Sequence, residues 1–357
     1  MPTTVARCEI DPAIERVVVD EMAFPLGVYP IEPIEPRQGY TLDFESSDGD
    51  DGAGEWEEWP DRYVFDVVIS AERLPALLHS LLSLMPARVY PILDVLGRDA
   101  HREIDPYISY DLLGLDQLLD SLIAYRPVFL EDGLVGFGAM SDAPFFYVFV
   151  DEHKIVTIRA EPELKDRVER IVQSFDLAER DDPAGADAVA HEHRGVLRSP
   201  VDDPGLLSLD EIIERLRDEW RLLLNVDPEA NLDDRGRDLG VTPWRCLVRV
   251  GDDGSAVRYA EVMLTATCLR EAEDMALDAV LADAPSMPVG AEPLVVAADR
   301  LGPIDFGREL GLKPDPRPQT RPGPKGSARA GKGSVRGDAD GFSEVKLWAR
   351  RWLDSAE

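Results

Sequence analysis

Apolar residues recur with strand and helix periods in the first half of the chain. Residues 63–69 and 88–96 alternate like strands, and the segment between them has one apolar helix face. That face consists of Leu74, Leu77, Leu78, Leu81, Leu82 and Met85. The pattern predicts a strand–helix–strand unit whose two strands lie parallel in one sheet.

The pattern continues with short elements up to residue 178. It predicts helices at 115–123 and from Pro162 onward. Hairpins are expected around Asp132-Gly133 and Glu152-His153. Glycines spaced by bulky apolar residues in 133–138 (GLVGFG) predict a strand that another backbone approaches closely.

Residues 179–205 lose the apolar period and contain several acidic residues, prolines and glycines, which is typical of a domain boundary. A clear helix follows, because Ser208 and Glu211 form a capping box before an apolar stripe that reaches Leu224. Strands at 244–250, 256–267 and 293–298 and a helix at 269–281 complete the second half of the chain.

These elements predict an α+β protein with mixed or antiparallel sheets in two domains. The expected division is an N-terminal domain at 1–178, a linker at 179–205, a C-terminal domain at 206–312, a basic Pro/Gly-rich tether at 313–341 and an amphipathic helix at 342–354. The segments 112–122 (LLGLDQLLDSL) and 206–216 (LLSLDEIIERL) are alike, and each precedes a hairpin and a helix. This likeness suggests an internal duplication.

Net charge changes the picture of possible partners. The 357 residues include 38 basic and 70 acidic side chains, giving −32, with an acidic loop at 43–61. Such a body repels nucleic acid and anionic membrane surfaces. The sequence has no secretory signal pattern and no apolar run long enough to cross a membrane, so we expect a soluble, cytoplasmic protein.

The C-terminal tail has the opposite charge. Residues 313–357 contain 10 basic and 6 acidic residues, a net charge of +4. Five cations recur every four residues: Lys313, Arg317, Arg321, Lys325 and Arg329. The prolines and glycines between them favour an extended tether. Beyond it, Phe342, Val345, Trp348 and Trp352 share one face of a predicted helix.

That helix needs an apolar partner, because a helix this short is marginal alone in water. The partner is either the protein's own body or a groove on another protein, with Trp348 and Trp352 as anchors. The leading hypothesis is therefore a non-enzymatic adaptor that binds proteins through its tethered helix. The alternatives are an enzyme with its site in the interdomain cleft and a protein that contacts nucleic acid through its basic tail.

Candidate chemistry in the sequence is sparse, and no catalytic, cofactor-binding or metal-binding residue is predicted. His191-x-His193 has the right ligand types for a metal but falls in the predicted linker, where we interpret it as solvated. Cys8, Cys246 and Cys268 lack the spacing of metal or redox motifs. A weak anion-binding patch is expected from the strand residues Arg245, Arg249 and Arg258.

Overall fold

The computed structural model describes residues 8–47, 59–201, 203, 205–233, 235–251, 257–282, 293–312 and 342–353. The chain forms two compact units, Met1–Leu96 with Ile104–Asn225, and Gly97–Glu103 with Val226–Glu357. Both units combine helices with antiparallel sheets, which confirms the α+β class. The chain therefore leaves the first unit near residue 225 and not at 179–205, so the predicted domain boundary is wrong.

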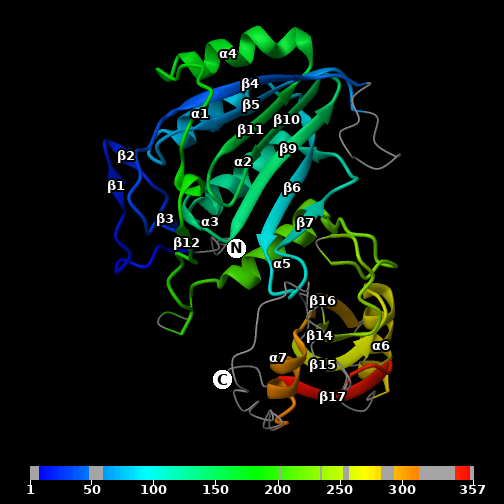
Figure 1. Cartoon of the computed structure of the whole chain (residues 1–357). Helices are drawn as coiled ribbons and strands as arrows, with labels where there is room; N and C mark the ends of the chain where they lie inside the picture. Colours follow the sequence, from blue (N-terminus) through cyan, green and yellow to red (C-terminus); the bar gives the residue numbers. More distant parts are fainter. Residues whose placement is uncertain are drawn as a thin grey trace, which may run out of the picture. The chain divides into compact units, whose positions relative to one another are not determined.

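A nine-stranded antiparallel sheet forms the first unit (Figure 1). Its order is β13-β7-β6-β9-β10-β11-β5-β4, and β8 pairs with β6. The strands are β4 (Gly39–Glu45), β5 (Arg62–Val68), β6 (Arg88–Leu96), β7 (Ile104–Ile108), β8 (Leu113–Gly114), β9 (Val135–Asp142), β10 (Phe145–Val150), β11 (Val156–Ala160) and β13 (Leu223–Leu224). Three antiparallel strands separate β5 from β6, so these two run parallel, as the sequence predicts.

Within the described residues of this unit, five helices pack on the sheet through one shared core. They are α1 (Leu74–Leu82), α2 (Leu115–Ala124), α3 (Arg126–Glu131), α4 (Lys165–Gln173, preceded by the 3₁₀ turn Pro162–Leu164) and α5 (Leu209–Trp220). The predicted stripe of α1 is buried. The sheet supplies Leu93, Ala139, Val148 and Ile158 to the same core, and these residues alternate with Ile92, Met140, Tyr147 and Arg159 on the opposite face.

Helix α5 explains why the predicted boundary fails. Its capping box forms as expected, with Ser208 and Glu211 exchanging hydrogen bonds. Its apolar stripe as far as Trp220, however, packs into the core of the first unit, where the Trp220 ring stacks on Phe129 at 5.8 Å. The predicted continuation of the stripe to Leu224 is wrong, because the helix ends at Trp220 and Leu223–Leu224 form β13. The irregular segment 179–205 therefore belongs to the first unit and does not separate two domains. Both leucine-rich helices, α2 and α5, lie in this core, while the duplication itself stays a prediction.

Short strands at the N-terminal end complete the first unit. β1 (Val18–Val19) pairs with β2 (Met22–Ala23), and β3 (Val28–Pro30) pairs with β12 (His191–His193). A 3₁₀ turn at Ala186–Ala188 precedes β12. The strand β12 falls inside the predicted linker at 179–205, so part of that segment is built into the fold.

The second unit contains a four-stranded antiparallel sheet in the order β16-β14-β15-β17. Its elements are β14 (Thr242–Val250), β15 (Arg258–Ala266), α6 (Leu269–Leu281), β16 (Pro293–Arg300), α7 (Pro303–Glu309) and β17 (Lys346–Leu353). The loop 97–103 joins this unit through a buried ion pair, in which Arg300 Nη2 lies 2.9 Å from Asp99 Oδ1.

The C-terminal segment is a strand and not the predicted helix. β17 pairs antiparallel with β15 and forms one edge of the sheet, with Tyr259 opposite Leu353 at one end of the pairing and Thr265 opposite Lys346 at the other. The Trp348 ring packs edge-on against Phe306 and Phe342, and its Nε1–H donates to Thr265 Oγ1 at 3.1 Å. Without β17, the backbone N–H and C=O groups along one side of β15 would have no strand partner, and pairing with the C-terminal segment satisfies them. A short isolated helix is only marginally stable in water, so the strand pairing overrides the helical period of the sequence.

Other local expectations have mixed outcomes. The predicted hairpin at Glu152-His153 is confirmed as the β10–β11 turn, and β9 confirms the glycine-bearing strand. The hairpin predicted at Asp132-Gly133 is wrong, because α3 ends there, and β9 turns into β10 at 143–144 instead. The core of the acidic loop, 48–58, and the tether 313–341 lie outside the described residues. Among those described, no helix is long and apolar enough to span a bilayer.

Candidate metal centre

Three of the five histidines of the chain converge in the first unit. One ring nitrogen from each of His153, His191 and His193 lies within 4.8 Å of the other two. The rings stand edge to face, with centroids 4.8 to 5.0 Å apart. All three side chains are half-buried. Neutral imidazoles in this arrangement are a typical ligand set for a transition metal.

Strand pairing brings two of these ligands to one face. β12 lies beside β3 (Figure 1). The two strands pair antiparallel, with His191 opposite Pro30 and His193 opposite Val28. Alternate residues of a strand share a face, so the two imidazoles project together. Glu192 projects the other way and accepts a hydrogen bond from the Tyr29 hydroxyl at 2.6 Å.

The third ligand comes from the tight turn between β10 and β11. Asp151 Oδ1 accepts the Ile155 N–H at 2.8 Å, and the Lys154 N–H donates to the Asp151 carbonyl. Lys154 has φ 65°, a left-handed conformation, and its buried ammonium donates to the Val135 carbonyl. These contacts hold the turn, and with it His153, against β9.

Backbone acceptors fix the tautomers of His191 and His193. His191 Nδ1 lies 2.8 Å from the Val189 carbonyl oxygen, and His193 Nδ1 lies 2.7 Å from that of Gly133. A carbonyl oxygen only accepts, so each Nδ1 carries the proton and each Nε2 presents a lone pair. This outer-shell pattern is the one that orients metal-bound histidines.

A close backbone contact positions the acceptor of His193. A Cβ on Gly133 would lie 2.0 Å from the Gly27 carbonyl oxygen, and one on Gly27 would lie 2.1 Å from the Gly133 nitrogen. Arg194 ties both loops together, since its N–H donates to Gly27 and its carbonyl accepts from Gly133. Only glycine fits at these two positions.

The electrostatics differ among the three rings. Burial opposes charge on His153, but the Asp151 and Glu152 carboxylates, each with an oxygen 3.4 Å from Nδ1, and Asp187 raise its pKa above the ordinary value. Burial lowers the pKa of His193, and the neighbouring histidines add to that effect. His193 is therefore held neutral, while carboxylates surround the outer edge of His153 and favour a cation nearby.

The spacing suits a small divalent ion. His153 Nε2 and His191 Nε2 are 3.0 Å apart. Tetrahedral zinc with Zn–N bonds of about 2.0–2.1 Å separates its ligand nitrogens by roughly 3.3 Å, so small ring movements admit the ion. Three imidazole ligands leave a fourth position for water.

The residues predicted to bind partners lie elsewhere. Phe342 and Trp348 pack on Phe306, Val345 is exposed, and Trp352 lies under the Arg258 guanidinium at 4.3 Å. The tether cations Lys313, Arg317, Arg321, Lys325 and Arg329 are outside the described residues, so their role in binding a protein or nucleic acid stays a prediction. The adaptor hypothesis depends on a docking helix at 342–354. The described segment 342–353 contains no helix, and its strand β17 pairs with β15 of the same unit.

The predicted anion patch is divided among internal contacts. Arg245 Nε pairs with the buried carboxylate of Glu261 at 2.7 Å, and Arg351 pairs with the same group. Arg258 stacks on Trp352. Arg249 of β14 lies opposite Tyr259 of β15 in the sheet. The described contacts thus commit Arg245 and Arg258 to the sheet itself.

The sequence predicts His191-x-His193 to be a solvated pair in a linker, although both residues are metal-ligand types. The missing information was the pairing of β12 with β3 and the approach of His153, 38 residues earlier in the chain. A signal was present, because an HxH pair at strand spacing puts both rings on one face. The third ligand, in a turn, has no fixed spacing to them.

Comparisons with known proteins add no relative to this picture. The chain matches no protein-family model, and searches of curated proteins and of solved structures find no match. The histidine cluster is accordingly interpreted from its own geometry.

Proposed function

We propose that this protein binds a divalent transition metal, with Zn²⁺ as the expected ion, through His153, His191 and His193. The observation that carries the proposal is the convergence of three imidazole nitrogens within 4.8 Å. Two of them are pre-set as Nε2 lone pairs by carbonyl acceptors. Imidazole ligands suit zinc, copper, nickel and iron, and the absence of thiolates from the set disfavours an iron–sulfur cluster.

The ion would join two segments that are distant in sequence, and a hydrogen bond attaches a third segment to them. His153 belongs to the β10–β11 turn, His191 and His193 belong to β12, and the acceptor of His193 lies in the loop after α3. Metal binding to the folded state alone adds to stability in proportion to the logarithm of metal concentration over Kd. The expected role is therefore at least a structural clamp on this side of the first unit.

Cobalt(II) substitution tests the ligand set. The full chain, freed of metal with a chelator, is titrated with Co²⁺ while visible absorption is recorded. Tetrahedral nitrogen coordination gives strong visible bands that octahedral aqueous Co²⁺ lacks, and one equivalent should saturate them. His191→Ala and His193→Ala should each abolish the bands, while His79→Ala, at an exposed helix position, should leave them intact.

Absence of tetrahedral bands in the wild-type protein, or bands that persist in both variants, would contradict the proposal. Zn²⁺ added to the cobalt-loaded protein should bleach the bands at one equivalent, since zinc binds such sites more tightly than cobalt.

A further inference from the structure

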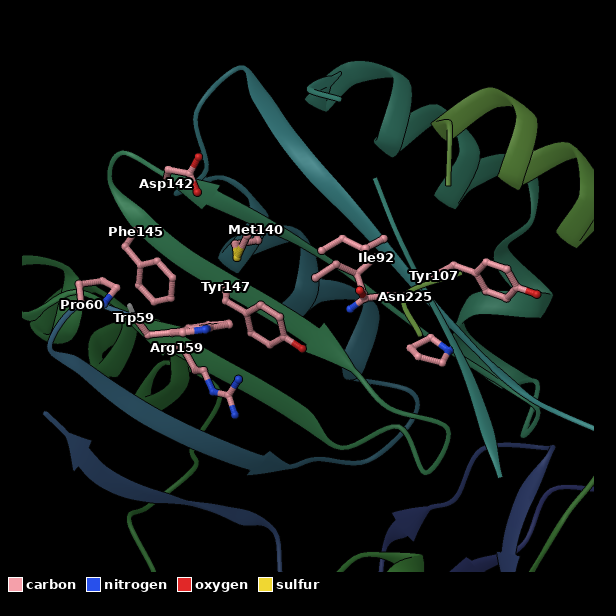
Figure 2. A pocket seen from close by; sticks show the side chains of 12 residues that line it. Trp59, Pro60, Ile92, Tyr107, Met140, Asp142, Phe145, Tyr147, Arg159 and Asn225 are labelled. Atoms are coloured by element: carbon pink, nitrogen blue, oxygen red, sulfur yellow. The ribbon is translucent and has the colours of Figure 1, made fainter. Parts of the chain in front are cut away.

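A second feature of the first unit lies on the face of the sheet opposite the helices. A cavity of about 610 Å³ opens there over strands β6, β7, β9, β10 and β11 (Figure 2). Its volume falls within the roughly 300–1,000 Å³ of ordinary ligand sites. It shares no lining residue with the histidine cluster.

The floor of the cavity is aromatic and apolar. The Trp59 ring stands edge-on to Phe145 at 5.3 Å and to Tyr147 at 6.3 Å. Met140 and Ile92 extend this surface along the sheet (Figure 2). Tyr147 is itself supported by the ring of Phe149, at 6.0 Å, which lies over the backbone of Gly138. A flat apolar body would be well matched by this floor.

Arg159 is the one basic side chain among the residues that line the cavity. The Arg159 guanidinium lies 5.3 Å from the Trp59 ring centroid and 5.4 Å from that of Tyr147. Its Nε is buried and makes no hydrogen bond, and no ion pair of Arg159 exists within the described ranges. Its neighbour Arg62 also lies over the Trp59 ring, at 5.1 Å, and its Nε likewise makes no hydrogen bond, but Arg62 pairs with Glu45 at 2.7 Å. In a chain of net charge −32, a cation without a carboxylate partner is notable.

The charges at the two ends of the cavity would orient a charged ligand. Asp142 and Arg159 lie on opposite sides of Met140 and Tyr147 (Figure 2). An anionic group would be repelled at the Asp142 end and attracted at the Arg159 end, where the guanidinium offers forked donors to a planar oxyanion.

We infer that this cavity binds a small anion with a flat apolar body, its carboxylate, sulfonate or phosphate held by Arg159 and its body lying on Trp59, Phe145 and Tyr147. The site is independent of the metal proposal, since the two share no residue. The aromatic floor, the Arg159 guanidinium without an ion pair in the described ranges and the Asp142 carboxylate at the other end of the cavity support this assignment.

The test uses two fluorescent probes that share one aromatic body. 8-Anilinonaphthalene-1-sulfonate carries an anion, and N-phenyl-1-naphthylamine is its neutral counterpart. Each is titrated into the folded full chain with the metal chelated, so that failure of the metal proposal leaves this result unaffected. The anionic probe should bind at one site per chain, at least tenfold more tightly than the neutral one.

Variants locate the anion. Arg159→Gln should weaken the sulfonate at least tenfold and the neutral probe less than twofold, while Arg159→Lys, which keeps the charge but loses the fork, should give an intermediate loss. Arg170→Gln, an exposed position on α4, is the matched control and should change neither. Far-UV circular dichroism confirms the fold, and Arg159→Lys remains decisive if Arg159→Gln does not fold.

Competition then separates the possible anions. Displacement of the bound sulfonate by 1-naphthoate at lower concentration than by 1-naphthyl phosphate would assign a carboxylate ligand, and the reverse order a phosphate. Equal affinity of the two fluorescent probes, no binding, or sulfonate binding that is the same in wild type, Arg159→Gln and Arg159→Lys would overturn the inference.

Discussion

His153 and His191 face each other with their Nε2 atoms 3.0 Å apart. Because His191 Nδ1 donates to the Val189 carbonyl, its Nε2 is an acceptor, and His153 Nε2–H is the donor in the metal-free protein. A metal ion would replace that shared proton. Metal binding should therefore release protons, and its affinity should fall as pH decreases through the range in which histidine titrates.

The close contact of Gly133 with Gly27 should be essential to the histidine cluster. Gly133→Ala places a Cβ 2.0 Å from the Gly27 carbonyl oxygen and must displace the loop that accepts from His193. We expect zinc affinity to fall by about 10- to 100-fold, as for other outer-shell changes. The free energy of unfolding should also fall by about 1–3 kcal/mol. Gly307→Ala, with open space around it, is the control; calorimetry and urea titration measure both effects.

Asp94 should make stability depend on pH. Burial, helped by the charge of Glu152, raises its pKa from 3.8 to about 7. Between these values the folded state binds a proton that the unfolded state does not, so stability falls as pH rises from about 4 to 7. Asp94→Asn should then stabilise the protein by about 2–4 kcal/mol at pH 8 and much less at pH 4. Equal effects at both pH values, in urea titrations, would refute the assignment.

Trp220 should stabilise the first unit, which tests the placement of α5. Its ring stacks on Phe129, and its Nε1–H donates to Ser121 Oγ at 3.1 Å. Trp220→Ala should cost about 3–5 kcal/mol, and Trp220→Phe should cost less because most of the packing remains. Leu223→Ala, at a side chain 60% exposed, should change stability by less than about 0.5 kcal/mol. Urea unfolding followed by circular dichroism measures the loss of stability, which should be largest for Trp220→Ala, smaller for Trp220→Phe and smallest for Leu223→Ala.

The C-terminal strand should stabilise the second unit from within the same chain. A protein that ends at Leu312 loses β17 and exposes the edge of β15, so we expect a lower Tm and greater self-association. A synthetic peptide of residues 342–353 should restore the Tm, and the peptide with Trp348→Ala should restore it less. A truncated protein with unchanged Tm would contradict the observed pairing and would return the segment to its predicted role as a docking element.

Local periodicity predicted most elements correctly, because the interactions that define them are local. The stripe of α1, the capping box of α5 and the Glu152-His153 turn each contain their own signal. The prediction for the tail is wrong for the opposite reason. The aromatic residues of 342–353 fit a helical face, but pairing with β15 decides their conformation, and the paired residues are 81 to 94 positions apart in the sequence.

The candidate site could be predicted only in part. The HxH pair was visible in the sequence, but its structural context depends on pairing with β3, more than 160 residues earlier. The arginine–aromatic cavity had no local signal at all, because Trp59, Tyr147 and Arg159 come together only when the sheet closes. Long-range pairings of this kind are not encoded in the period of any one segment.

Isothermal titration of Zn²⁺ into the chelator-treated full chain tests the central claim most directly. Run in two buffers of different ionisation enthalpy, it gives the stoichiometry, the affinity and the number of protons released. We expect one site per chain, proton release, and at least about 100-fold weaker binding when His193 is replaced by alanine, with no change for His79→Ala. No binding, or binding that is unchanged in a His153→Ala/His191→Ala/His193→Ala variant, would show that the histidine cluster is not a metal centre.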